Sequence, residues 1–151
     1  MAFLAHAMEY QGGPLSSELS LRCYEDSDYP RYRRVYESCF HEMRAALGRF
    51  PVDCCADRGE LLRKRNQIFI LEDEGELAGS VAIFGNEVDD LIVAEQFQKK
   101  GYGTALLCFA VSRLQRACVS PIVLHVADWN QNALRLYLQN GFQIVHTEEV
   151  E

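Results

Sequence analysis

The stretch VAEQFQKKGYGT, residues Val93–Thr104, joins a predicted strand to a predicted helix and decides the fold. Glycine lets the backbone come close to a ligand, and the free N–H groups of a helix's first turn point at whatever lies above them. The helix macrodipole favours negative charge there, and Lys99 and Lys100 add positive charge. The stretch therefore predicts an anion site, and a diphosphate is its natural occupant.

Two common nucleotide-binding motifs do not fit this stretch. A Walker A loop needs Gly-Lys followed by Ser or Thr, and the sequence does not contain it here. A dinucleotide fingerprint needs a third glycine at the position of Leu106. A G-x-G before a helix is also compatible with a plain structural turn, so the neighbouring segments have to decide between the two interpretations.

The segments before the glycine turn predict a short strand, two helices and an antiparallel meander. Alternation of apolar and polar residues indicates the strands, and Asp26, Ser27 and Asp28 offer N-caps for the first helix. Gly48 is expected to end that helix, and Arg49–Cys55 is expected to be a loop. The predicted elements are the strand Leu19–Tyr24, helices to Leu47 and over Ala56–Arg65, and the strands Gln67–Glu72, Leu77–Phe84 and Glu87–Val93.

After the glycine turn, helices and strands alternate. The predicted elements are a helix over Tyr102–Ala117, a strand over Pro121–Val126, a helix over Asn130–Gln139 and a strand over Phe142–His146. This order predicts an α/β fold, a mixed α+β sheet in which an antiparallel N-terminal meander joins a parallel C-terminal part, with helices on both faces. Residues 1–17 are expected to form an N-terminal tail or arm, and residues 18–151 a single domain.

Two motifs resemble those of a known family. The order strand, Gln98-x-x-Gly101-x-Gly103, helix resembles the Q/R-x-x-G-x-G/A signature of the GNAT superfamily of N-acetyltransferases, which binds the pyrophosphate of coenzyme A. The segment Asn130–Phe142 is similar to that family's N-x-x-A-x-x-L-Y-x-x-x-G-F segment. The motifs occur in the same order as in the family, each on the element that the family requires, and the resemblance covers roughly residues 67–146.

The resemblance implies a GNAT fold, acetyl-CoA as co-substrate, and direct attack of an amine on the thioester within a ternary complex. The phenol of Tyr137, with a reference pKa of about 10, would donate a proton to the leaving thiolate. Asn130 would hold the pantetheine arm, and Tyr137 would lie beside it. The backbone of Leu91, Ile92 and Val93 would pair with that arm, and the pyrophosphate would bind at Gln98, Lys99, Lys100, Gly101, Tyr102, Gly103 and Thr104.

The attacking amine must lose a proton, and the carboxylates on the strand before the glycine turn are the candidate acceptors. Glu87 aligns with a position at which several family members carry a glutamate base, and Asp89 and Asp90 are its rivals. Alternation places Glu87 and Asp89 on one face of the strand and Asp90 on the other, unless a bulge intervenes. Each of these carboxylates is as well explained by a solvated strand face.

Composition excludes several other classes of function. The net charge is -7 and the longest basic run is Arg63–Arg65, which disfavours nucleic acid as a partner. No leader-like start and no long apolar run is recognised, so neither export nor a membrane is expected. The six cysteines form no C-x-x-C pair and the four histidines form no ligand spacing, so we expect a reduced cytoplasmic protein without a metal site.

Three questions stay open at the level of sequence. The acceptor amine is either a small molecule or a peptide, because the acceptor pocket of the family is built by the segment that corresponds to residues 29–66, which contains no readable motif. A homodimer is possible. The alternative function is a non-catalytic acyl-CoA-binding sensor or interaction module of the same fold, against which the presence of Tyr137 argues.

Overall fold

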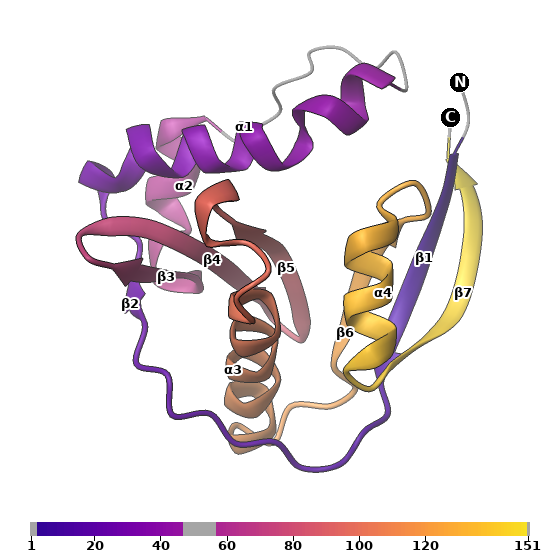
Figure 1. The fold of residues 1–151 in the computed structure, drawn as a ribbon. Helices are drawn as coiled ribbons and strands as arrows, with labels where there is room; N and C mark the ends of the chain where they lie inside the picture. Colours follow the sequence, from indigo (N-terminus) through magenta and orange to yellow (C-terminus); the bar gives the residue numbers. More distant parts are fainter. Residues whose placement is uncertain (1–2, 47–56, 151) are drawn as a thin grey trace.

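A seven-stranded sheet organises the chain, with its strands in the order β2-β3-β4-β5-β6-β1-β7 (Figure 1). The structure is a computed structural model; it describes the backbone of residues 3–46 and 57–150 and the side chains of residues 3–40 and 57–150. The strands are β1 Phe3–Tyr10, β2 Arg22–Cys23, β3 Ile68–Asp73, β4 Glu76–Phe84, β5 Glu87–Val93, β6 Val123–Ala127 and β7 Phe142–Val150. The helices are α1 Tyr29–Ala46, α2 Arg58–Arg63, α3 Tyr102–Arg116 and α4 Gln131–Gln139.

Most predicted elements are present, with shifts at their ends. The strand expected over Leu19–Tyr24 is reduced to Arg22–Cys23, and α1 follows a single 3-10 turn, Asp26–Asp28, whose N-cap is Glu25. The predicted meander β3-β4-β5 is antiparallel throughout, which confirms this part of the fold. The loop expected over Arg49–Cys55, and Gly48 before it, lie outside the described residues.

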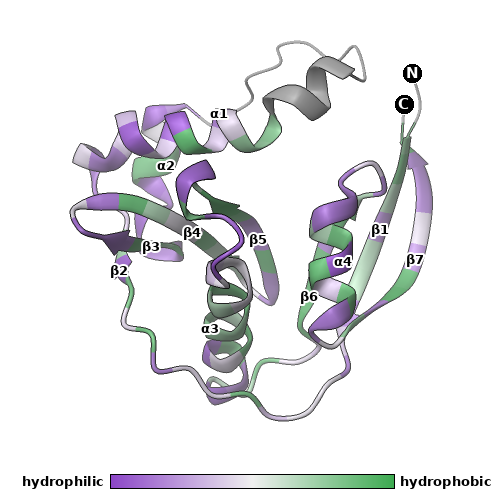
Figure 2. Ribbon diagram, in the orientation of Figure 1, coloured by the Kyte–Doolittle hydropathy of each residue, from purple (hydrophilic) through white to green (hydrophobic). Residues whose placement is uncertain are grey.

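Helices cover both faces of the central strands, as predicted. The alternation of β4 shows how: Val81 and Ile83 belong to the core shared with α3 and α4, whereas Ala78 and Ala82 belong to the core shared with α1 and α2. In Figure 2 the strand β4 is coloured largely hydrophobic, β5 is hydrophobic toward its end and hydrophilic toward its start, and much of α1 is hydrophilic. A strand that is buried on both faces is nearly all apolar. In agreement, β4 is buried from Leu77 to Ile83, and the one polar side chain in this run, Ser80, donates a hydrogen bond to Phe69 O.

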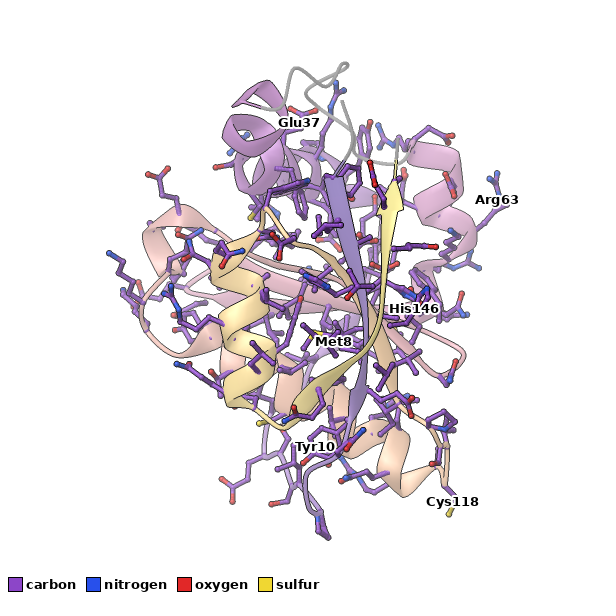
Figure 3. The ribbon with its side chains drawn as sticks, turned by 90° about the vertical axis from the view of Figure 1, so that its right-hand side faces the viewer. Met8, Tyr10, Glu37, Arg63, Cys118 and His146 are labelled. Carbon is purple, nitrogen blue, oxygen red and sulfur yellow. The ribbon has the colours of Figure 1, made fainter. Side chains whose placement is uncertain are left out.

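The expectation of a loose N-terminal arm is wrong for Phe3–Tyr10. These residues form β1, which is inserted between β6 and β7 and runs antiparallel to both. Met8 of β1 is fully buried, and the ring of Tyr10 packs edge-on against Phe142 with 5.4 Å between centroids. Figure 3 shows Met8 and Tyr10 on β1 next to the β7 strand that carries His146. A short apolar run gains its strand conformation from long-range partners, which the local pattern does not reveal.

This insertion places the parallel part of the mixed sheet at its centre, between β5 and β6. Since β6 and β7 are both antiparallel to β1, they run in the same direction without being neighbours. In the described part of the sheet, β5 and β6 are the one parallel pair, and their register is a single residue pair, Glu87 with Val123. Beyond that pair the two strands diverge, as the ribbons in Figure 1 show, and divergent strands are a common place for a ligand.

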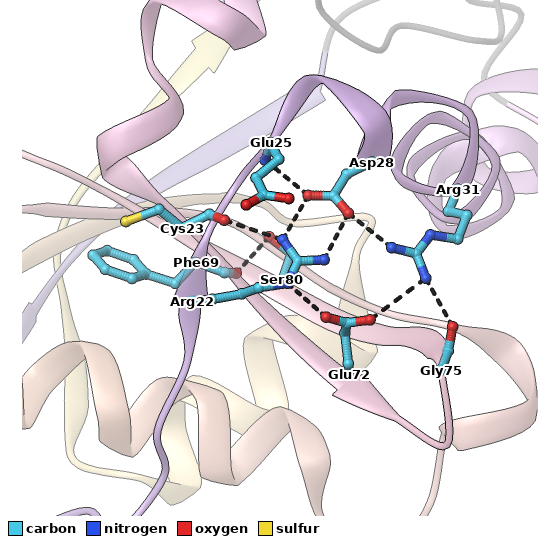
Figure 4. Close-up of polar contacts among 9 residues, drawn as sticks. All are labelled: Arg22, Cys23, Glu25, Asp28, Arg31, Phe69, Glu72, Gly75 and Ser80. Atoms are coloured by element: carbon cyan, nitrogen blue, oxygen red, sulfur yellow. Dashed lines mark hydrogen bonds and ion pairs between the residues drawn. The ribbon is translucent and has the colours of Figure 1, made fainter.

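A buried carboxylate fixes the start of α1 to the sheet (Figure 4). Asp28 is 0% exposed and accepts two hydrogen bonds of 2.7 Å from Arg22 and one of 2.8 Å from Arg31. Both arginines also pair with Glu72 on β3. Burial alone would raise the pKa of Asp28, but the arginine hydrogen bonds outweigh it and hold that pKa below its usual range. The network therefore sets where α1 begins, and through it the position of the helix over β5.

Candidate active site

A cavity of about 690 Å³ lies where β5 and β6 diverge. Its walls come from α1, from β5 and the glycine turn, from the start of α3, from β6, and from α4 with the loop before it. All predicted cofactor residues except Ile92 and Lys100 line it. The side chain of Ile92 is 1% exposed and belongs to the core under α1, and Lys100 places its Nζ over the ring of Phe97, 5.6 Å from the centroid.

One end of the cavity is built to receive an anion. Gly101 is the N-cap of α3 and has φ +86, a left-handed conformation that glycine adopts without strain. The helix begins with the bond from Ala105 N to Gly101 O, so the N–H groups of Tyr102, Gly103 and Thr104 have no partner within the helix. No atom lies within 4 Å of where a Cβ on Gly101 would be, and Lys99 lines the same end. This arrangement fits a diphosphate.

The carbonyl of Val93 is already engaged at the end of β5. It accepts a hydrogen bond of 3.1 Å from Gln98 Nε2 and a contact of 3.4 Å from the Cys39 thiol. A carbonyl oxygen has two lone pairs, so an amide of a bound pantetheine arm would compete with both donors. The predicted pairing at Val93 therefore requires the Gln98 side chain or the Cys39 thiol to move aside.

The other end of the cavity is acidic. Asp90 has φ +46, and the β4–β5 register shifts here, so the bulge that the sequence left open is present. The bulge brings Asp89 and Asp90 to the cavity together, and Asp90 N donates to Asp89 Oδ1 at 2.8 Å. The Tyr36 hydroxyl of α1 donates to Asp90 Oδ1 at 3.2 Å. Burial, followed by the negative charge of Asp89, raises the pKa of Asp90 to about 6.

Glu87 does not line the cavity in this structure. Its Oε1 lies 3.1 Å from His125 Nδ1, in a pair whose histidine side chain is 57% exposed. His125 itself reaches the cavity wall from β6. The resemblance favours Glu87 as base, but Asp89 and Asp90 are the carboxylates of β5 that line the cavity.

Tyr137 of α4 lies in the wall of the cavity. It is 8% exposed, and its ring packs edge-on against Phe142 with 6.1 Å between centroids. Burial and the charges of Asp89 and Asp90 raise the pKa of its phenol well above the usual value, so the phenol keeps its proton throughout the neutral range. A protonated phenol beside two carboxylates can act as a proton donor.

The loop before α4 is supported by the N-terminal strand. Asp128 N donates to Leu4 O at 2.8 Å, and Asp128 Oδ1 lies 2.8 Å from Nε2 of the buried His6. The ring of Phe3 packs edge-on against Trp129, which lines the cavity next to Asn130. Asn130 caps α4, since its Oδ1 accepts from Ala133 N at 3.4 Å. Residues of β1 thus position a wall of the site, a role that sequence analysis missed.

Tyr36 and Cys39 are further site residues that sequence analysis missed. The signal was present for Tyr36, because Tyr32, Tyr36 and Phe40 recur at intervals of four and share one face of a helix. The sequence does not show that this face of the helix lies toward the cavity. That placement follows from the position of α1 across β5 in the structure.

Other expected features can be checked only within the described residues. There, no group of three metal-ligating side chains occurs, and Cys23, Cys39, Cys108 and Cys118 are free thiols. Cys54 and Cys55 lie outside the described ranges. No helix in ranges 3–46 and 57–150 combines the length and apolar character that crossing a membrane requires.

Comparison with protein families gives a match over most of the chain. The family model described as the acetyltransferase (GNAT) family matches residues 20–142. Among curated proteins, L-ornithine N5-acetyltransferase NATA1 from Arabidopsis thaliana is 32% identical over 60 residues, which is 40% of this chain and 26% of that protein. The chain therefore spans about a quarter of this relative.

Solved structures share the fold at low sequence identity. An acetyltransferase from the GNAT family of Colwellia psychrerythraea aligns with a TM-score of 0.69 and 13% identity, over 99% of this chain and 56% of that chain. PaiA N-acetyltransferase from Thermoplasma acidophilum, solved in complex with coenzyme A, aligns with a TM-score of 0.68 and 17% identity, over 82% of this chain and 89% of that chain. These likenesses confirm the mixed-sheet fold.

Proposed function

Because the chain belongs to the GNAT acetyltransferase family, we propose that it transfers the acetyl group of acetyl-CoA to an amine. The observation that carries the proposal is a single cavity that joins the first-turn amides of α3 to the carboxylate of Asp90, with the phenol of Tyr137 in its wall. One end suits a diphosphate, and the other end suits a cationic amine and its proton.

The residues present fit the coenzyme. The N–H groups of Tyr102, Gly103 and Thr104, with Lys99 beside them, would hold the pyrophosphate. The pantetheine arm would be held by the backbone of Leu91, Ile92 and Val93 and, from the opposite wall, by Asn130. Bound in this way, acetyl-CoA supplies a thioester at the acidic end of the cavity.

In this proposal Asp90 is the general base of the reaction and Tyr137 is its general acid. Asp90 takes the proton of the amine, and the amine nitrogen bonds to the thioester carbonyl carbon. As the carbon–sulfur bond breaks, Tyr137 donates its proton to the sulfur, which leaves as the thiol. The second proton of the nitrogen, released as the amide forms, returns to the Tyr137 oxygen and restores the phenol. A carboxylate whose pKa is raised to about 6 is a stronger base than an ordinary one and is still ionised at pH 7.

The acidic end also limits the class of acceptor. Of the described residues that line the cavity, Lys99 is the one Lys or Arg, and it lies at the phosphate end. Asp89 and Asp90 occupy the acceptor end together with the aromatic rings of Tyr36 and Phe40. Such a surface favours a cationic alkyl amine and disfavours a carboxylate next to the reacting nitrogen. The similarity to an enzyme named for ornithine N5 supports the same class.

Thiol release from acetyl-CoA with a panel of amines tests this function. The panel contains alkyl diamines and polyamines, peptides with a lysine side chain, free amino acids and aminoglycosides. We expect turnover, with kcat/KM at least about tenfold higher for diamines than for the α-amine of glycine or alanine, since one lost or opposed charge contact is worth about 1.4 kcal/mol or more. Binding of coenzyme A without turnover of any amine would instead favour a non-catalytic module.

The surroundings of the protein belong to the same proposal. Four described thiols are free, and Cys39 lies in the wall of the cavity, which suits a reducing compartment such as the cytoplasm. We therefore place the activity there and give it no metal and no nucleic-acid partner; a homodimer is compatible with it.

A further inference from the structure

We propose that Tyr36 is a positioning residue for the reaction: its hydroxyl holds the carboxylate of Asp90 in the orientation and ionisation state that amine deprotonation needs. The contact is the 3.2 Å hydrogen bond from Tyr36 Oη to Asp90 Oδ1. It joins α1 to the bulge of β5. The inference rests on the function proposed above and adds a second element, α1, that controls the base.

The ring of Tyr36 is fixed between two other rings of α1. It stacks on Tyr32 with 6.0 Å between centroids and an interplanar angle of 30°, and it contacts Phe40 at 4.9 Å. Tyr32 is itself 1% exposed and packs edge-on against Tyr24 at 5.6 Å. Because the ring is packed on both sides, the position of the Tyr36 hydroxyl is restricted. The hydrogen-bond donor to Asp90 is therefore preorganised.

The Asp90 carboxylate, in contrast, sits on a distorted strand. Its own backbone is in the left-handed region, and its N–H is bound to Asp89. Four other ionisable groups act on it: Asp89 and Glu87 on β5 disfavour its charge, Lys64 after α2 favours it, and Tyr36 favours it by hydrogen bonding. Tyr137 on α4 faces the same pair of carboxylates. Tyr36 is the member of this set that donates a described hydrogen bond to the carboxylate.

A hydrogen bond to the ionised form of a carboxyl lowers its pKa. Removal of the Tyr36 hydroxyl should therefore raise the pKa of Asp90, so that less of it is ionised at neutral pH. The acidic limb of the kcat/KM profile would move to higher pH, and the remaining carboxylate would be less well oriented.

The test is Tyr36→Phe, which keeps the ring and deletes the donor. We expect the midpoint of the acidic limb to rise by about 0.5–1 pH unit and kcat at pH 7 to fall about three- to tenfold, with KM for acetyl-CoA unchanged. In an Asp90→Asn background the same substitution should change kcat less than twofold, because the group it acts through is gone. Tyr10→Phe is the matched control: its hydroxyl donates to Gly13 O at 2.6 Å and does not line the cavity, so the limb should stay in place.

Two results would overturn the inference. One is an acidic limb that stays at the wild-type midpoint in Tyr36→Phe; the other is an equal loss of kcat in the Asp90→Asn background. A ¹³C NMR titration of the Asp90 carboxyl in folded wild-type and Tyr36→Phe protein reads the same shift without turnover. If no amine is acetylated by the wild type, the proposed function fails, while the titration still decides whether Tyr36 controls Asp90.

Discussion

Replacement of Asp90 by asparagine is expected to lower kcat/KM for the amine by about 10²- to 10⁴-fold, the range in which a positioned general base contributes. Asparagine is the suitable change because it keeps the shape and tolerates the left-handed backbone at φ +46. The pKa of Asp90 is about 6. In the wild type, kcat/KM should therefore rise tenfold per pH unit up to about pH 6, as the Asp90 carboxyl ionises, and level off at higher pH. The variant should lose this acidic limb.

The same substitution should stabilise the fold at alkaline pH. The pKa of Asp90 is raised in the folded chain, so between about pH 4 and pH 6 the folded form keeps a proton that the unfolded form has lost. Stability therefore falls as pH rises through that window, and above it the buried charge costs up to about 3 kcal/mol. Melting curves should show a higher Tm for Asp90→Asn at pH 8 and no gain at pH 4.

These two readouts separate a catalytic role from a structural one. If Asp90 only held β5 in place, the asparagine variant would melt at a lower temperature at pH 8. Glu87→Gln serves as the matched carboxylate control on the same strand. It should retain most of the activity, since Glu87 itself does not line the cavity and its carboxylate pairs with His125. A larger loss for Glu87→Gln than for Asp90→Asn would return the role of base to Glu87.

Tyr137→Phe is expected to lower kcat by about 10²- to 10³-fold, because the leaving thiolate then departs without its proton donor. The ring fills the same space at 8% exposure, so the free energy of unfolding should change by less than about 1.5 kcal/mol, the net value of a typical hydrogen bond. The affinity for coenzyme A should also stay the same. Stopped assays of kcat, together with melting curves, measure both effects.

The pH dependence of this residue has a definite sign. Burial and the charges of Asp89 and Asp90 raise the pKa of the Tyr137 phenol, so it stays protonated through the whole practical range. Any alkaline limb of the wild-type kcat profile below pH 10 must then persist in Tyr137→Phe. A variant with wild-type kcat, or one that loses such a limb, would show that another group protonates the sulfur.

Local patterns were sufficient for the part of the fold around the glycine turn. The run before Val93, the turn at Gly101 and the apolar period of α3 each contain their own signal within a few residues. The strand β1 could not be found in this way. Its partners lie more than a hundred residues away, and Gly12 and Gly13 separate it from the rest of the chain.

The choice among the three carboxylates shows the same limit inside the site. An ideal strand alternates its side chains, and on that rule Asp89 and Asp90 point to opposite faces. The bulge at Asp90 breaks the rule, because one strand carries an extra residue that the partner strand does not match. The alternation of side chains along the sequence does not show where a bulge occurs. The sequence therefore could not decide which of the three carboxylates is the general base.

The central claim is that the start of α3 holds the diphosphate of coenzyme A, and calorimetric titration tests it directly. A Cβ on Gly103 would lie 3.4 Å from Leu136 and 4.0 Å from Val93, in ordinary contact, so Gly103→Val should fold while its branched side chain narrows the cavity. Gly13→Val, with open space around its Cβ, is the control. We predict saturable binding of one coenzyme A per chain in the wild type and in Gly13→Val, and at least about tenfold weaker binding in Gly103→Val. No heat of binding in the wild type, or equal affinity in all three proteins, would contradict the claim.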